Sequence, residues 1–252
     1  MTFFIWGVLP YVVLLILISG LTWRYKYDQF GWTTRSSQLY ESRILKIASP
    51  IFHFALLAVF IGHLVGLLVP KAFTDWAGLS QEMYHLGAFY GGGLAGLALA
   101  VALGMLIWRR RRTGRVFKAT TANDKFMYLV LAIVIILGLL ATFTGETHLN
   151  GEHHNYRETV SVWFRSMVIF QPDVAPMAAS TWQFKAHVFF GLFLFAITPF
   201  TRLVHAFTAP LHYLFRPYIV YRSRDTSKAR QVSAGGRGWD PVGTSDRDKG
   251  RR

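Results

Sequence analysis

The sequence predicts an all-α membrane protein, a bundle of five transmembrane helices. Apolar residues make up 52% of the 252-residue chain and charged residues only 16%, which is too few charges for an ordinary soluble surface. The chain also contains five uncharged stretches close to the length that a helix needs to cross a bilayer, about 17–25 residues. These stretches are residues 3–23, 47–69, 86–108, 126–144 and 186–201.

The first and the last of these stretches require separate arguments. Residues 3–23 lack the basic start and the A-x-A-like site of a secretory signal, so we expect them to remain as a membrane span. Residues 186–201 are short, but the apolar pattern resumes beyond Arg202 as far as about Thr208. A long arginine side chain can reach water from within a span, so we expect the fifth helix to continue through Arg202.

The distribution of basic residues predicts the orientation of the bundle. Residues 24–46 hold five Lys and Arg, residues 109–123 hold six and residues 209–252 hold ten. The opposite connections hold far fewer, with one in residues 70–83 and two in residues 147–182. Because basic connections stay in the cytoplasm, we expect the N-terminus outside and the C-terminus in the cytoplasm. The net charge of +14 then reflects membrane topology rather than nucleic-acid binding.

Two segments outside the spans have their own character. In the connection 147–182, the apolar residues of 159–170 recur at helical spacing, which predicts a helix along the outer interface, with an ordinary packed loop as the alternative. Residues 223–252 are rich in Gly, Ser and Arg, which is typical of a disordered tail or a contact arm. We therefore expect a transmembrane domain in residues 1–222 and a separate basic tail after it.

The absence of cysteine limits the cofactors that the chain can hold. Disulfides and iron–sulfur clusters bound by this chain are excluded. A covalent c-type haem is excluded too, because its attachment requires C-x-x-C-H. Any haem in this protein is therefore held non-covalently.

Four of the nine histidines lie inside the predicted spans. His53 and His63 belong to the second span, and His187 and His205 to the fifth. One ionisable side chain in a span is often explained by a hydrogen bond to a neighbouring helix, but two on each of two helices indicate a functional site.

Depth in the membrane pairs these histidines. The second and fifth spans run in opposite directions, so His53 lies at the depth of His205 and His63 at the depth of His187. Neutral imidazole is a good ligand for haem iron, so each pair can hold one haem b between the two helices. The sequence thus predicts an inner haem on His53 and His205 and an outer haem on His63 and His187.

The spacing of the histidines agrees with this pairing only in part. His187 and His205 are 18 residues apart, which is five full turns and about 27 Å along a straight helix. His53 and His63 are 10 residues apart, or about 15 Å. Helix tilt or a kink at Pro199 has to absorb the difference.

Other residues fit a bundle with cofactors, although each also has a simpler explanation. Small residues in the spans can let a porphyrin approach the backbone, or can serve close helix packing. Lys185 and Arg202 can pair with haem propionates, or can extend to the membrane surface. We expect His153 and His154, in a polar loop, to be solvated. The small residues are Gly62, Gly66, Gly91, Gly92, Gly93, Gly96 and Gly191, and the other histidines outside the spans are His85, His148 and His212.

Two stretches carry a resemblance to a known family. The segment from Phe52-His53-Phe54 through Gly62-His63 to Gly66 resembles the second helix of the gamma subunit of respiratory membrane-bound nitrate reductase, its cytochrome b subunit. The segment from His187 through Pro199 and Arg202 to Pro210 is similar to its fifth helix. The resemblance covers nearly everything up to Arg222, and the histidine spacings of ten and eighteen are its most specific part.

The resemblance implies a multi-pass protein of the cytoplasmic (inner) membrane of a prokaryote, part of a quinol:nitrate oxidoreductase. It implies two haems b, quinol oxidation near the outer haem and electron transfer to an iron–sulfur beta subunit, with nitrate reduced in a molybdenum-containing alpha subunit. Members of this family often carry a lysine just before the third helix, linked to the quinol site, whereas residues 81–85 of this chain contain no lysine. The candidate quinol-site residues, at the depth of the outer pair, are Gly62, Gly66, Tyr84, His85 and Lys185.

Three other functions remain open at this point. A cytochrome b anchor of a formate dehydrogenase, a hydrogenase or a sulfite-reduction complex would share the histidine pairs and the quinone. A transporter or channel using buried histidines as a proton relay would bind no haem. A purely structural anchor would tolerate replacement of all four histidines.

Overall fold

The computed structural model describes residues 1–28, 37, 40–145 and 154–208, and these residues form helices without any strand. The all-α class is therefore confirmed for the described part of the chain. The proposed division at residues 222 and 223, the basic tail, and His148, His153 and His212 lie outside the described residues.

Among the described residues, five helices are long and apolar enough to cross a membrane, in agreement with the five predicted spans and with a multi-pass membrane protein. The helices extend beyond the uncharged stretches, because flanking polar residues continue the same hydrogen-bonded turns. The spans are η1 (Phe4–Val8) with α1 (Leu9–Tyr27), α2 (Arg43–Leu68), α4 (Gln81–Gly87) with η3 (Ala88–Gly92) and α5 (Gly93–Arg112), α7 (Ala122–Thr144), and α10 (Trp182–Ile197) with η4 (Thr198–Phe200).

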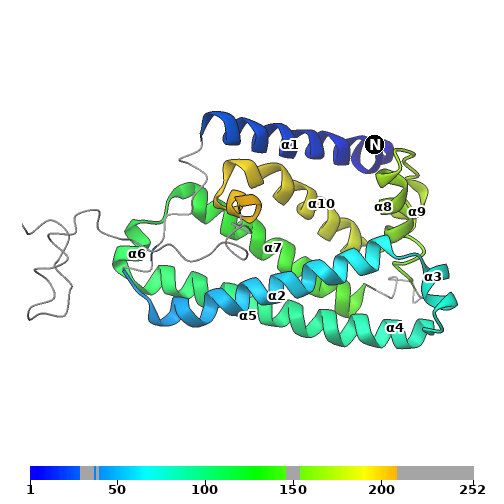
Figure 1. Cartoon of the computed structure of the whole chain (residues 1–252), viewed down its shortest axis with the longest axis horizontal. Coiled ribbons are helices and arrows are strands. Elements are labelled where there is room, and N and C mark those ends of the chain that lie inside the picture. Colours follow the sequence, from blue (N-terminus) through cyan, green and yellow to red (C-terminus); the bar gives the residue numbers. More distant parts are fainter. Residues whose placement is uncertain (29–36, 38–39, 146–153, 209–252) are drawn as a thin grey trace, which may run out of the picture. The chain divides into compact units, whose positions relative to one another are not determined.

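Short helices connect the spans at the two ends of the bundle. The α6 helix lies at one end, and α3, α8 and α9 lie at the other (Figure 1). These ends are called the α6 end and the α8 end below. The bounds are α3 (Lys71–Trp76), α6 (Gly114–Lys118), α8 (Val160–Val168), α9 (Ala175–Ala179) and η5 (Arg202–Thr208).

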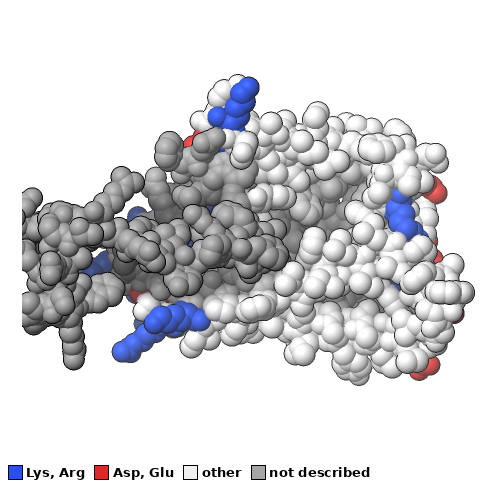
Figure 2. Space-filling view, viewed as in Figure 1, with Lys and Arg blue, Asp and Glu red and all other residues white. Residues whose placement is uncertain are grey.

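The spans pack in a defined order. The α2 helix packs along α5, α5 packs on α7, and α10 packs between α7 and α1. Buried apolar side chains fill the space between α2, α5 and α7, while the described surface between the two ends carries no charge on the face shown in Figure 2. This distribution suits a bundle whose outer wall faces lipid. The cluster consists of Phe52, Ala55, Leu99, Ala102, Leu103, Met127, Leu131 and Ile135.

The predicted helix in the long connection is confirmed as α8. Its apolar side buries Val160, Trp163 and Met167 against the bundle. The indole of Trp163 donates to the carbonyl of Trp6 at 2.7 Å, and the hydroxyl of Ser161 donates to the carbonyl of Gly66 at 2.8 Å. The alternative of an ordinary packed loop is thereby excluded for residues 160–168.

The expectation that the fifth helix continues through Arg202 is wrong. The α-helix ends at Ile197, a 3-10 turn follows, and Thr201 is extended with φ −122° and ψ 178°. Proline at position 199 has no N–H to continue the α-helical ladder. At this break α1 approaches closely, because a Cβ on Gly20 would lie 2.7 Å from the Cβ of Pro199.

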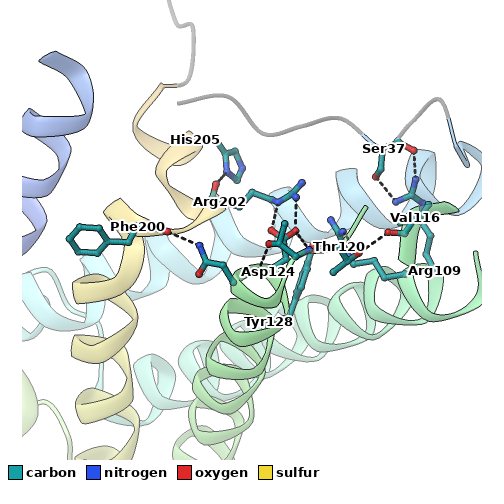
Figure 3. A network of polar contacts seen from close by, with 12 residues as sticks. Ser37, Arg109, Val116, Thr120, Asp124, Tyr128, Phe200, Arg202 and His205 are labelled. Atoms are coloured by element: carbon teal, nitrogen blue, oxygen red, sulfur yellow. Dashed lines mark hydrogen bonds and ion pairs between the residues drawn. The ribbon is translucent and has the colours of Figure 1, made fainter. Parts of the chain in front are cut away.

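A buried arginine fixes the connection between the first two spans. Arg109, at the C-terminal end of α5, is 1% exposed. It donates to the carboxylate of Glu41 at 2.5 Å and to the hydroxyl and carbonyl of Ser37, both at 2.8 Å (Figure 3). Burial acts to raise the pKa of Glu41, but hydrogen bonds from the Ile44 backbone and from Arg109 outweigh it and lower that pKa. The contribution of Glu41 to stability is therefore present above the ordinary carboxyl range and is lost as the pH falls through the lowered pKa.

Replacing Arg109 with Ala is expected to lower the free energy of unfolding by roughly 1–3 kcal/mol, because it removes the donor to Glu41 and Ser37, of which Glu41 is only partly buried. The midpoint of thermal unfolding in detergent is the measurement. The matched control is Arg111→Ala, an exposed arginine on the same turn of α5, which should change the midpoint little. Equal destabilisation by both substitutions would contradict the role assigned to Arg109.

Candidate functional site

The four histidines predicted for the second and fifth spans lie in two pairs, although the structure places His205 on η5, just beyond the fifth span. The ring centroids of His53 and His205 are 6.1 Å apart, and those of His63 and His187 are 5.9 Å apart. Imidazoles that bind opposite sides of one metal, each through a nitrogen at about 2 Å, place their centroids about 6 Å apart. The structure therefore brings together the same pairs that membrane depth predicts, at a separation suited to a metal between them.

Packed aromatic rings also adopt centroid distances of about 4.5–7 Å, so the hydrogen bonds of the rings are the more specific observation. In all four histidines Nδ1 is bonded to a backbone carbonyl oxygen. A carbonyl can only accept, so each Nδ1 carries a proton, and in the neutral imidazole Nε2 then keeps its lone pair. Metal-bound histidines are oriented in this way. The contacts are His53 to Ser49 at 2.7 Å, His63 to Val59 at 2.8 Å, His187 to Val134 at 3.1 Å and His205 to Arg202 at 2.6 Å.

The break after α10 explains how His205 reaches His53. On a straight helix His205 would lie about 27 Å from His187, beyond the span of the α2 pair. In the structure His205 lies on η5 instead, after the extended residue Thr201. The two histidine spacings, 18 residues on one side and 10 on the other, are therefore reconciled because the α-helix ends at Ile197 and His205 lies on a separate short 3-10 segment.

The residues present fit haem better than a bare metal ion. In the described part of the chain no group of three or more His, Cys, Asp or Glu side chains comes together. Two imidazoles suit a metal whose remaining positions are filled by a macrocycle. Gly62 directly precedes His63 and Gly191 lies one turn after His187, and a Cβ on either would meet no atom within 4 Å, so neither position obstructs a flat ligand.

The other small residues of the spans differ in whether they have open space beside them, as a porphyrin would need, or serve close helix packing. A Cβ on Gly91 or Gly92 would also meet nothing within 4 Å. A Cβ on Gly93 would lie 3.0 Å from Phe143, and one on Gly96 would lie 2.8 Å from Leu139. Gly93 and Gly96 therefore serve close packing of α5 on α7.

Two of the candidate quinol residues, Gly66 and Tyr84, lie next to Tyr156 at the α8 end. The hydroxyl groups of Tyr84 and Tyr156 are 3.2 Å apart and share a hydrogen bond. A Cβ on Gly66 would lie 3.2 Å from the Tyr156 hydroxyl and 3.6 Å from that of Tyr84. Gly66 is three residues beyond His63, so this hydroxyl pair lies about one helical turn from the outer pair of histidines.

A buried arginine, which sequence reasoning did not single out, organises this group. Arg157 is 2% exposed, and its guanidinium lies 3.8 Å from the ring centroid of Tyr84. It donates to Gln81 at 3.0 Å and to Thr74 at 2.7 Å. The signal that could have found it is a basic residue next to a tyrosine in a connection with few basic residues.

The expectation that His154 is solvated is wrong. His154 is 3% exposed, its Nε2 lies 3.1 Å from the hydroxyl of Thr159, and its ring contacts Phe184 at 5.5 Å. Tyr156 contacts the same phenylalanine at 5.8 Å. The connection folds back over the start of α10, and a local polar composition does not reveal such a long-range contact.

The remaining candidates have contacts of their own. His85 lies beside Phe89 at 5.9 Å, and the Lys185 ammonium donates to the Ala178 carbonyl at 2.7 Å. Arg202 binds both oxygens of Asp124, each at 2.9 Å (Figure 3). The propionate contact expected for Arg202 stays a prediction, and the structure adds an ion pair within the protein.

Comparison with known proteins identifies the family of this chain. Residues 2–224 match the family described as nitrate reductase gamma subunit. The chain is 41% identical over 220 residues to the nitrate reductase gamma chain of Bacillus subtilis (strain 168), covering 87% of this chain and 97% of that one. It is 31% identical over 224 residues to the respiratory nitrate reductase 2 gamma chain of Escherichia coli (strain K12), covering 88% and 96%.

A longer relative is also similar. The chain is 56% identical over 220 residues to the nitrate reductase-like protein NarX of Mycobacterium tuberculosis, covering 87% of this chain and 34% of that protein. The chain therefore spans about a third of the length of NarX.

Proposed function

Because this chain belongs to the nitrate reductase gamma subunit family, a family of membrane cytochrome b subunits, we propose that it binds two haems b and carries electrons from quinol to an iron–sulfur partner subunit. The family makes it a subunit of an oxidoreductase complex, which favours nitrate reductase over the anchors of other reductases and over a histidine-based transporter. Nitrate itself is reduced elsewhere in the complex, in the molybdenum-containing alpha subunit.

The observation that carries this proposal is the state of the four imidazoles. Each is held by a carbonyl through Nδ1, and the rings face each other in pairs at 6.1 and 5.9 Å. Haem, when bound, supplies a one-electron carrier at each of two depths. The four imidazole nitrogens would hold the haem irons, and the positions of His53 and His63 on α2 would set the distance between the two sites, about 15 Å along the helix.

The ends of the bundle are assigned to the two sides of the membrane from their charge. The α6 end carries Arg109–Arg112, Arg115 and Lys118, as cytoplasmic connections do. We place this end in the cytoplasm, where the iron–sulfur subunit docks near the His53 and His205 pair. The α8 end, with His63 and His187, faces outward.

We place quinol oxidation at the α8 end, near His63 and His187. Quinol must release protons as it loses electrons, and the hydroxyl pair of Tyr84 and Tyr156 offers a group that can take part. One hydroxyl donates to the other, so the second proton remains available to another acceptor. Protons released outside while electrons cross inward separate charge, which is worth about 2.3 kcal/mol per charge at 100 mV. Gly62, Gly66, Tyr84, His85 and Lys185 remain the candidate contacts.

The purified protein is expected to contain two b haems per chain, and single replacements should affect them in pairs. His63→Ala and His187→Ala should disturb one haem, and His53→Ala and His205→Ala the other. The pyridine haemochrome count and the spectrum of each low-spin haem are the measurements. A protein without haem absorbance would favour the proton-relay alternative, and coupling of His53 with His187 would contradict the pairing.

Quinol-driven reduction is expected to acidify the outer side only. The measurement is external pH in sealed vesicles of known orientation after a quinol analogue is added. Acidification confined to the cytoplasmic side would overturn the placement of quinol at the α8 end.

Tyr84→Phe and His85→Ala are expected to slow quinol-driven haem reduction by roughly 10-fold or more, as loss of a proton-transfer group does. Both variants should keep two haems. The control is Tyr90→Phe, at an exposed tyrosine of η3, which should reduce haem at the normal rate. A normal rate in both test variants would remove these residues from the quinol site.

A further inference from the structure

The four imidazoles are not held in the same way. His53 and His63 each donate to a carbonyl four residues earlier on α2, so α2 orients its own histidines. His187 donates instead to Val134, a residue of α7. His205 donates to Arg202, whose side chain is bound by Asp124 of α7. We propose that α7, which carries no histidine, positions both His187 and His205 through two separate contacts, one in its middle and one at its N-terminus.

The first contact lies in the apolar middle of α7. The Nδ1 of His187 donates to the Val134 carbonyl at 3.1 Å. One turn later, a Cβ on Gly138 would lie 2.9 Å from Cε1 and 3.3 Å from Nδ1 of the same ring. The Cε1–Nδ1 edge of the imidazole therefore lies against the 134–138 turn, in the volume that a side chain at position 138 would occupy. Glycine at this position sets how closely the ring approaches α7, and the carbonyl sets its rotation.

The second contact lies at the N-terminus of α7. Asp124 belongs to the capping box that begins this helix with Thr121, so its carboxylate is fixed to the helix end. It binds the Arg202 guanidinium through two hydrogen bonds of 2.9 Å (Figure 3). The carbonyl of Arg202 then accepts the Nδ1–H of His205 at 2.6 Å.

A neighbouring residue strengthens this end. The side-chain amide of Asn123 donates to the Phe200 carbonyl at 2.8 Å. Asn123 and Asp124 thus hold the residues on either side of Thr201, where the backbone is extended. Because η5 is a short 3-10 segment with weak hydrogen bonding of its own, these contacts from α7 contribute directly to the position of His205.

The two contacts are independent of each other, so they can be tested separately. The positions 124 and 138 are 14 residues apart, or about 21 Å along the helix. Gly138→Ala should change only the haem of His63 and His187. Asp124→Asn keeps an acceptor oxygen but loses the two-oxygen ion pair, and should change only the haem of His53 and His205.

The experiment uses the intact membrane complex with its haems bound. The EPR g-values of each oxidised low-spin haem and its midpoint potential are measured for each variant, together with haem retention on dilution. We expect a shift in the g-values and potential of one haem per variant, and about 10–100-fold weaker retention of that haem, the usual cost of losing a group that orients a metal ligand. The controls are Gly104→Ala, where a Cβ meets nothing within 4 Å, and Asp75→Asn, at an exposed carboxylate.

The result that would overturn the proposal is an equal change of both haems in either variant, or an unchanged spectrum in both. Alanine favours a helix over glycine by about 1 kcal/mol, so Gly138→Ala is expected to assemble. If Asp124→Asn does not assemble, Asn123→Ala takes its place and must shift the haem of His53 and His205 alone. The proposal rests on the proposed function for the presence of two haems, and the haem count of the unaltered complex tests that point separately.

Discussion

A metal held between two imidazoles requires the rings to face each other across about 6 Å with the Nε2 lone pairs directed inward. In the proposed haem sites one ring comes from α2 and the other from α10 or η5, so this requirement would fix the distance, depth and rotation of α2 relative to the α10–η5 segment. The centroid distances of 6.1 and 5.9 Å meet it at both depths. Much of the remaining structure can be understood as support for these two distances.

The interior of a membrane offers no water to polar groups, so each imidazole needs a partner for its second nitrogen. Backbone carbonyls supply it in all four cases. Because the partners are backbone carbonyls, no polar or charged side chain is needed for this purpose in the middle of the spans. Charged groups are confined to the ends, where Arg109, Arg157 and the Arg202–Asp124 pair make several hydrogen bonds each.

The charged side chains at the ends of the bundle form hydrogen bonds between segments that do not pack against each other through their helices. Arg109 holds Ser37 and Glu41 of the first connection, and Arg157 joins Gln81 and Thr74 to Tyr84. Asp124 fixes the segment after the break at Thr201. Since association of apolar helices in lipid gains no hydrophobic energy, such polar contacts at the ends have a large share in the unique geometry of the bundle.

The sequence by itself determined the number of spans, their class and the pairing of histidines, because hydropathy and chain direction are local properties. Five apolar stretches can only be helices in a membrane, and antiparallel spans allow His53 to meet only His205, and His63 only His187. The family was also readable from the motifs around these residues, and the match over residues 2–224 confirms it. The orientation of the termini and the haem ligation stay predictions.

Only the tertiary structure decided what depends on contacts between distant residues. Two of these features are contacts that no periodicity predicts: the burial of His154 against Phe184 and the hydrogen bond between Tyr84 and Tyr156. A third is the end of the helix before the extended residue Thr201. The same holds for Gly138, whose missing side chain makes room for a ring 49 positions away. A sequence pattern reports which face of a helix is apolar, whereas the partner that fills a given space on that face is set by the packing of the whole bundle.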